Sequence, residues 1–261
     1  MKIGIIGAGN MGGAIARGLA ADPDFCTADI TVCSPNNHGE LDALKADYPD
    51  MNVDTDNEKA ILGTDIIILA VKPWLVYDVM DPLSSKIQWE KQMLVSVAAG
   101  ITLSQLEDLS LCTPPAVFRV MPNPAIAVRK SMTFICSIGA SDEQIKSVSD
   151  IFSRLGSVMV IDENQMTACM ALASCGIAYA MRYVRAASEG GVELGVKADL
   201  AKDIVLQTMQ GAAALLQATG AHPEAEIDKV TTPGGITIKG LNAMEAHGFT
   251  TSVIEGLKAS K

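Results

Sequence analysis

The sequence has few of the residues that metal sites and stacking surfaces need. Three of its 261 residues are His, aromatic residues make up 4%, and the six cysteines form no CxxC pair. No metal site is therefore expected. Lys and Arg are also scarce, 20 against 30 acidic residues, which gives a net charge of −10. Nucleic acid and anionic lipid are not expected partners, because both bind clustered basic residues.

Long apolar runs without polar interruptions are missing as well. The uncharged stretch 164–181 is about as long as a minimal membrane span, yet Gln165, Thr167 and Ser174 interrupt it, so a packed helix is expected instead. Glycines break up the apolar start, which argues against a signal peptide. With 49% apolar residues, we expect a soluble, cytoplasmic protein whose cysteines are reduced and mostly buried.

Two halves of the chain differ in periodicity. Up to about Ile161, short β-branched runs alternate with helical patterns, which is typical of βαβ units on a parallel sheet. The run Asp65–Val71 is apolar without alternation, as expected for a central strand covered on both faces. The remaining expected strands are residues 2–6, 30–33, 93–97, 117–120, 132–137 and 157–161. Helix starts are expected at Ser104 and Ser141.

Beyond about Asp162 the strand signal disappears and Ala, Leu, Met, Glu and Gln dominate. Glycine and proline signals divide this half into four or five helices. The sequence therefore predicts an α/β protein, with a Rossmann-type parallel-sheet domain over 1–161 followed by an all-α domain over 162–261. No flexible linker separates them.

A glycine-rich turn follows the first expected strand. Gly7, Gly9 and Gly12 form a GxGxxG motif between that strand and an apolar helix, 13–20. The first glycine permits the tight turn, the second lets the backbone approach a pyrophosphate, and the third lets helix and strand pack closely. The motif predicts dinucleotide binding at the helix N-terminus; a structural turn without a ligand is the alternative.

The end of the second strand bears on the choice of cofactor. An NAD-binding protein usually has an Asp or Glu there for the ribose, but the chain reads Ser34-Pro35-Asn36-Asn37, and no carboxylate follows until Glu40. This favours NADPH, with Ser34, Asn36 and Asn37 donating to a 2′-phosphate. NADH remains possible because no Arg is present, and a simple polar turn is the alternative.

Several motifs together resemble the pyrroline-5-carboxylate reductase family. They span nearly the whole chain in the family's order, and the one near the C-terminus is the most specific. They are Ile6-Gly7-Ala8-Gly9-Asn10-Met11, Ala70-Val71-Lys72-Pro73, Ser96-Val97-Ala98-Ala99-Gly100, Arg119-Val120-Met121-Pro122-Asn123-Pro124 and Val230-Thr231-Thr232-Pro233-Gly234-Gly235-Ile236-Thr237. The resemblance implies NADPH-dependent reduction of L-1-pyrroline-5-carboxylate, a cyclic imino acid, to L-proline, the last step of proline biosynthesis.

The cofactor contacts follow partly from the fold and partly from the resemblance. Loops just past the C-terminal ends of parallel strands line the ligand crevice of an open α/β sheet, which places Val71, Lys72 and Ala98 there. The resemblance carries Asn57, Val71, Lys72 and Ala98 over as cofactor contacts. The complete expected set is Ile6, Gly7, Ala8, Gly9, Asn10, Met11, Ser34, Asn36, Asn57, Val71, Lys72 and Ala98.

The segment 231–237 has the properties of a carboxylate receptor. Pro233 stiffens it, Gly234 and Gly235 bare the backbone, and a helix beginning near Ile236 offers free amides and a positive dipole end. An ordinary Pro-Gly turn is the alternative. The resemblance implies that this loop holds the substrate carboxylate and that the hydroxyl of Thr237 lies beside the ring nitrogen.

The substrate residues implied by the resemblance also include an acidic one. Glu163 matches a family position near the substrate, although by itself it would be a helix N-terminal charge. Two departures from the family are Ile177, in place of a Pro, and Lys229, where relatives often have Asn. The expected substrate-binding residues are Glu163, Thr232, Gly234, Gly235, Ile236 and Thr237, and Thr237 is the expected catalytic residue.

Two alternative functions are disfavoured by the sequence, and a homo-oligomer is expected. A β-hydroxyacid dehydrogenase would need a Lys in the helix after the boundary, whereas 163–183 contains none. A non-catalytic NADP sensor would be expected to have a damaged substrate loop, and this one is intact. Exposed apolar helix faces usually seek a second copy, and the resemblance implies a homodimer or higher homo-oligomer formed through the C-terminal helices.

Overall fold

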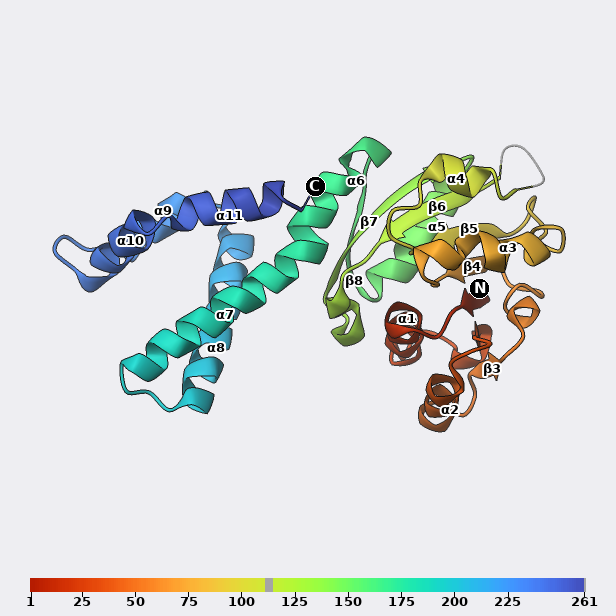
Figure 1. Cartoon of the computed structure of the whole chain (residues 1–261), viewed down its shortest axis with the longest axis horizontal. Coiled ribbons are helices and arrows are strands. Elements are labelled where there is room, and N and C mark those ends of the chain that lie inside the picture. The colour runs from red at the N-terminus through yellow and green to blue at the C-terminus, as the bar shows by residue number, and fades with distance from the viewer. Residues whose placement is uncertain (111–114, 261) are drawn as a thin grey trace. The chain divides into compact units, whose positions relative to one another are not determined.

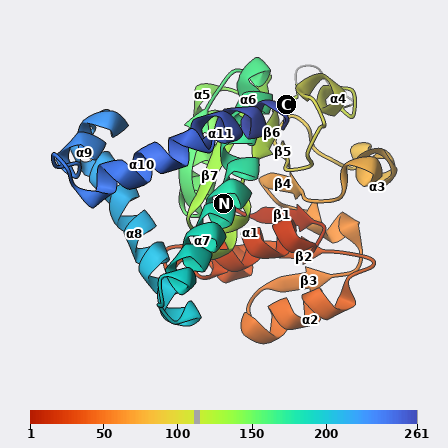
Figure 2. The same cartoon turned by 60° about the vertical axis from the view of Figure 1, so that its left-hand side comes forward.

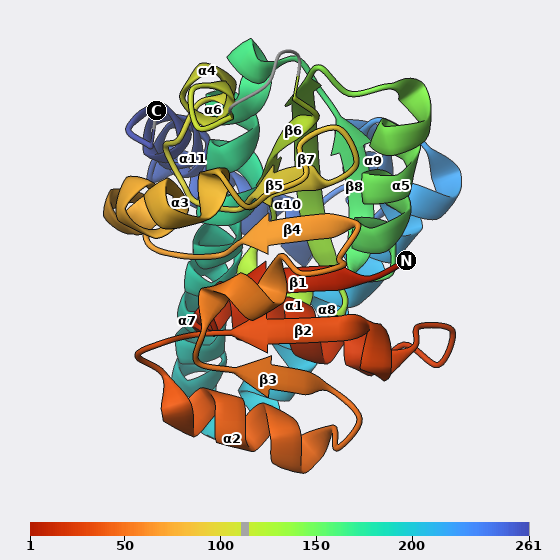
Figure 3. The ribbon, with the colours of Figure 1, turned by 90° about the vertical axis from the view of Figure 1, so that its right-hand side faces the viewer.

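The computed structural model describes residues 1–110 and 115–260. Within them, one eight-stranded sheet has the order β3-β2-β1-β4-β5-β6-β7-β8, and Figure 3 shows β3, β2, β1 and β4 side by side. The strand order reverses between β1 and β4, the switch point at which open α/β sheets bind ligands. The strands are β1 (Ile3–Ile6), β2 (Ile30–Cys33), β3 (Asn52–Asp54), β4 (Ile66–Leu69), β5 (Met93–Ser96), β6 (Val117–Met121), β7 (Ser131–Ile138) and β8 (Gly156–Val160).

The sheet confirms the Rossmann-type prediction with two differences. The β6–β7 pair is antiparallel, whereas the other neighbouring strands run parallel. Only residues 122–130 connect β6 to β7, which is too short for the crossover that a parallel pair needs. Strand β3 was not expected, because its three residues are too few to show a periodic pattern.

Helices cover both faces of the sheet, and Figure 1 shows them around it. Alternate strand residues pack into two separate apolar clusters, Ile5 and Ile68 in one, Ile67 and Leu69 in the other. Helices α1, α2 and α5 contribute to the first cluster, and α3, α4 and α6 to the second. These helices are α1 (Asn10–Ala20), α2 (His38–Asp47), α3 (Val76–Ser84), α4 (Leu103–Glu107), α5 (Asp142–Ser153) and α6 (Met166–Met170).

Capping residues explain where two of these helices begin. Ser141 is the N-cap of α5 and forms a capping box with Gln144, as expected from the sequence. The expectation for α4 was wrong: its N-cap is Thr102, which forms a capping box with Gln105, and Ser104 lies inside the helix. Both caps satisfy amides that would otherwise lack partners at a helix N-terminus.

The chain divides into two compact units, Met1–Ser174 and Cys175–Lys261. The division therefore falls later than the expected boundary after residue 161. Met166 is fully buried in the second apolar cluster of the sheet, and Met170 and Ala173 pack against that cluster. The first turns of the helical half consequently belong to the first unit, and a π-helical turn, Ala171–Cys175, spans the division.

The second unit is helical throughout its regular structure, as expected. In the described residues it contains α7 (Gly176–Glu193), α8 (Ala198–Thr219), α9 (Pro223–Lys229), α10 (Ile236–Ala246) and α11 (Phe249–Lys258), and Figure 2 shows α9, α10 and α11 following α8. Helices α7 and α8 pack against each other. The Tyr179 hydroxyl donates to the Gly256 carbonyl oxygen at 3.2 Å, which joins α7 to α11. No helix in the described residues is long and apolar enough to cross a membrane.

The cysteines differ from the expectation that most are buried. The five described cysteines are free thiols; Cys33 and Cys136 are buried, Cys26 is exposed, and Cys169 and Cys175 are intermediate. Cys112 lies outside the described residues. Burial raises the pKa of Cys33 to about 12, so this thiol stays protonated at neutral pH.

Candidate functional site

The turn between β1 and α1 is built as the glycine motif predicts. Gly7 has a φ of +104°, and its amide donates to the Cys33 carbonyl oxygen at 2.7 Å, which ties the turn to the end of β2. A Cβ atom at Gly12 would lie 1.9 Å from the carbonyl oxygen of Gly7. Both positions therefore need glycine for the fold itself.

Gly9 is different, because the protein does not need a glycine there. It is extended, with a φ of −79°, and a Cβ atom built on it would meet nothing within 4 Å. Gly9 is the N-cap of α1, whose first turn carries no acidic residue. The amides at this helix start are thus open to an anionic group that approaches the backbone closely. This geometry fits the pyrophosphate of a dinucleotide.

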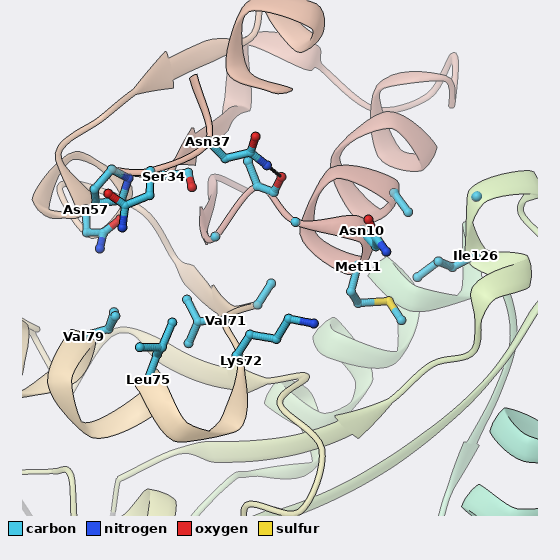
Figure 4. Close-up of a pocket in the computed structure, with 18 of the residues that line it drawn as sticks. Asn10, Met11, Ser34, Asn37, Asn57, Val71, Lys72, Leu75, Val79 and Ile126 are labelled. Atoms are coloured by element: carbon cyan, nitrogen blue, oxygen red, sulfur yellow. Dashed lines mark hydrogen bonds between the residues drawn. The ribbon is translucent and has the colours of Figure 1, made fainter. Parts of the chain in front are cut away.

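A cavity of about 670 Å³ extends from this turn along the carboxyl ends of the strands (Figure 4). Figure 4 shows Ser34, Asn37 and Asn57 on one side, and Val71, Leu75, Val79 and Lys72 on the other. The structure thus brings together most of the expected cofactor residues. Those that line the cavity are Gly7, Ala8, Gly9, Asn10, Met11, Ser34, Asn36, Asn57, Val71 and Lys72.

Two expected cofactor residues do not line this cavity. Ile6 is fully buried in β1, and Ala98 is 3% exposed in the turn after β5. Their side chains pack into the second apolar cluster of the sheet. Any contact that they make with a ligand is therefore through the main chain.

Asn57 carries an unused acceptor on the cavity wall. It begins a 3₁₀ turn, Asn57–Ala60, held by its N-cap Asp56. Its Oδ1 atom is buried and has no hydrogen-bond partner among the described residues. A buried acceptor without a partner is costly, and a ligand hydroxyl in the cavity would satisfy it.

The β2–α2 loop is tied directly to the glycine turn. The side-chain amide of Asn37 donates to the Ala8 carbonyl oxygen at 2.6 Å. Arg17 of α1 also pairs with Glu40 of α2, and the hydrogen bond to Glu40 raises the pKa of Arg17 above its ordinary value. These contacts fix the loop that carries Ser34 and Asn36.

Sequence reasoning missed the apolar part of the cavity. Leu75, Val79 and Ile126 line it. Leu75 ends the 3₁₀ turn Pro73–Leu75, Val79 lies in α3, and Ile126 lies in the 3₁₀ turn Pro124–Val128. Leu75 and Val79 follow the expected contacts Val71 and Lys72 closely along the chain. Their spacing across the start of a helix was the signal that could have identified them.

Glu163 lies in the first unit and is held by two donors. Its Oε1 atom accepts from the Leu103 amide at 2.8 Å and from Arg119 Nη1 at 3.0 Å. The side chain of Arg119 is 11% exposed and that of Glu163 33%. Burial, followed by the negative charge of Glu163, raises the pKa of Cys136 to about 11. The role of Arg119 was not foreseen, because its partner is 44 residues away in the chain.

The C-terminal loop has the expected geometry. Gly235 is the N-cap of α10, and Gly234 has a φ of +73°. The Gly235 amide donates to the Thr232 carbonyl oxygen at 2.9 Å. Thr237 lies in the first turn of α10 and is exposed, and Ile236 is 87% exposed. The loop belongs to the second unit, whereas the residues of the cavity belong to the first.

Comparisons with known proteins agree with this geometry. Residues 163–261 match the family model for pyrroline-5-carboxylate reductase dimerisation, and residues 2–100 match the model for NADP oxidoreductase coenzyme F420-dependent. Pyrroline-5-carboxylate reductase 1 of Dictyostelium discoideum is 37% identical over 270 residues, which cover 99% of this chain and 48% of that longer relative.

Other relatives align over nearly their whole length. The pyrroline-5-carboxylate reductase of Methanosarcina acetivorans is 35% identical over 271 residues, covering 100% of this chain and 97% of the relative. The crystal structure of Plasmodium falciparum pyrroline carboxylate reductase with NADP bound superimposes with a TM-score of 0.87 at 27% identity, covering 100% and 95% of the two chains. With this fold, this glycine turn and these relatives, the chain belongs to the pyrroline-5-carboxylate reductase family.

Proposed function

We propose that this protein reduces L-1-pyrroline-5-carboxylate to L-proline with NADPH, the last step of proline biosynthesis. The observation that carries the proposal is the presence of two glycine-bared helix N-termini in one chain. Gly9 opens the start of α1 and Gly235 opens the start of α10. The first suits a pyrophosphate and the second a carboxylate, and these are the two anionic groups of the proposed reactants.

On the cofactor side, the residues of the first unit bind and orient. The amides at the start of α1 hold the pyrophosphate, and Asn57 Oδ1 accepts from a ribose hydroxyl. Ser34 and Asn36 favour NADPH over NADH; NADH is the alternative, because the loop 34–37 after β2 contains no Arg. NADPH, when bound, supplies the hydride that adds to the carbon of the C=N bond.

On the substrate side, we assign binding to the C-terminal loop and Glu163. The backbone of Thr232, Gly234, Gly235 and Ile236 holds the carboxylate, and the Thr237 hydroxyl accepts a hydrogen bond from the protonated ring nitrogen. A protonated imine is already electrophilic, so no strong general acid is required. The chain's task is then orientation of the imine.

The proposal includes a homodimer formed through the C-terminal helices. Residues 163–261 match the dimerisation model of the family, and apolar side chains of α8 such as Leu200 and Ile204 are more than half exposed. A second copy would cover such a face. The proposal also places the enzyme in the cytoplasm, where its free cysteines would stay reduced.

The experiment that tests the function is NADPH oxidation by the purified protein with pyrroline-5-carboxylate. NADH and a reaction without the imine are run in parallel. Oxidation that depends on the imine and yields proline is the expected result. Binding of NADPH without oxidation would overturn the reductase assignment and favour a non-catalytic NADP sensor.

Gly9→Ala separates cofactor binding from folding. The substituted Cβ fits the free protein, since nothing lies within 4 Å of it, but it occupies the approach to the helix amides. We expect an unchanged melting temperature and a Kd for NADPH that rises about tenfold or more, equivalent to about 1.4 kcal/mol. Gly39→Ala in α2 is the matched control, because its Cβ also meets nothing within 4 Å. Equal NADPH affinity in both variants would exclude the α1 site.

A further inference from the structure

Arg119 is a buried charge in the middle of a strand that is otherwise apolar. It lies in β6, between buried Phe118 and Val120, and its side chain is 11% exposed. Its Nε atom is buried without a partner in the described part of the chain, so the guanidinium is held through Nη1 on Glu163. A charge in this position destabilises the fold unless its pairing is good, and the cofactor assignments above give it no task.

Glu163 connects Arg119 to the start of α4. The Oε1 atom that accepts from Arg119 also accepts from the amide of Leu103, the first residue of α4. One carboxylate oxygen thus joins β6, the start of α4 and the 3₁₀ turn Glu163–Gln165. The three elements belong to the first unit.

The bonds hold both ends of the turn between β5 and α4. At its beginning, Ser96 is paired with Arg119 in the sheet register, and its hydroxyl accepts from the Ala98 amide at 3.3 Å. At its end, Leu103 is bonded to Glu163 at 2.8 Å. The tip, Ala99 and Gly100, is exposed between these two fixed points.

The fold determines which part of a dinucleotide this turn faces. The half of the sheet with β1, β2 and β3 holds the adenosine side, and the half with β4, β5 and β6 receives the nicotinamide side. We propose that Arg119 is a positioning residue, which acts through Glu163 to fix the β5–α4 turn and thereby the nicotinamide ring. This inference rests on the proposed function and adds to it a residue that touches neither reactant.

The test substitutes Arg119→Met, which keeps the length of the side chain without its charge. A displaced nicotinamide lowers kcat, which we expect to fall about tenfold. The fluorescence emission of bound NADPH should change as well, because it reports on the surroundings of the ring. The Kd for 2′,5′-ADP, which lacks the nicotinamide, should stay within about twofold of wild type.

Arg154→Met is the matched control. Arg154 pairs with Asp22 at 2.8 Å elsewhere in the first unit, so its loss affects stability without affecting the β5–α4 turn. Glu163→Gln serves as a milder second variant. Because Glu163 is also assigned to substrate binding, the emission of bound NADPH without substrate is its readout, and this emission decides the matter if Arg119→Met does not fold. Wild-type kcat and NADPH emission in the folded variants would overturn the inference, as would equal changes in Arg154→Met.

The two proposals fail in distinguishable ways. A wild-type protein that binds NADPH but does not oxidise it removes the reductase function, while the emission of bound NADPH still decides the role of Arg119. A wild-type enzyme that turns over, with Arg119 variants that match it in kcat and emission, removes only the positioning role. If the wild-type protein does not bind NADPH, both proposals fall.

Discussion

The two units differ in how they bury their apolar residues. The first has two large buried clusters on opposite faces of its sheet. In the second, Ala201 and Glu226 are the buried residues within the described range 175–260, while Leu194 is 87% and Met181 62% exposed. A single copy thus completes the core of the first unit only. The second unit exposes apolar surface that only a further partner would bury.

Ile204→Glu in α8 tests this difference most strongly. Ile204 is 51% exposed and shares a helix face with Leu200 and Leu215. If a second copy covers this face, the variant buries an unpaired charge, which costs about 3–5 kcal/mol. The dimer dissociation constant should then rise about a hundredfold or more, as measured by analytical ultracentrifugation.

The control for this substitution is Ile204→Val, which keeps the position apolar and should leave the dimer intact. Binding of 2′,5′-ADP should be the same in both variants, because the cavity belongs to the first unit. A dimer of unchanged strength in Ile204→Glu would show that this face of α8 lies outside the interface.

Local signals explain which parts of the two units could be predicted from the sequence. The uninterrupted apolar run of β4 and the glycine turn after β1 are local signals, and both were identified from the sequence. The helix start at Gly235 is local too. Strand β3 was missed because three residues show no period, and the antiparallel direction of β7 leaves no mark on its apolar pattern.

Long-range pairing accounts for what was missed at the site. In the sequence, Arg119 is a single charged residue that interrupts an apolar strand. Its partner Glu163 is 44 residues away in the chain and meets it only in the folded protein. The Leu103 amide joins the same carboxylate across 60 residues. No spacing rule links such positions. Conversely, Met166 and Ala173 continue a helical pattern, and only their packing on the sheet assigns them to the first unit.

Asp22→Asn tests how much the ion pair between Asp22 and Arg154 stabilises the first unit. Asp22 is 6% exposed; its hydrogen bond with Arg154, then the Asp24 amide, hold its pKa below the ordinary value. A lowered folded-state pKa stabilises the fold above the unfolded-state pKa, and that stability is lost as pH falls through the folded value. The variant should lose about 1.5–3 kcal/mol of unfolding free energy near neutral pH.

The difference between wild type and Asp22→Asn should shrink in acid, once Asp22 itself is protonated. Urea unfolding at neutral and at acidic pH measures both effects. Asp150→Asn is the control: this carboxylate is 61% exposed in its pair with Lys146, and such pairs contribute about 0.3–0.5 kcal/mol. A loss for Asp22→Asn that is independent of pH would mean that packing, not charge, carries the effect.

Thr237→Ala produces the smallest expected effect. It tests whether the second unit contributes a side-chain hydrogen bond to the substrate. Thr237 lies in the first turn of α10 and is exposed in the single copy, so its removal should leave the melting temperature unchanged. Losing one hydrogen bond to the ring nitrogen should lower kcat/KM about tenfold. Thr237→Ser retains the hydroxyl and should restore most of the activity. If Thr237→Ala has wild-type kinetics, Thr237 is not part of the mechanism, and the loop contributes only its backbone amides.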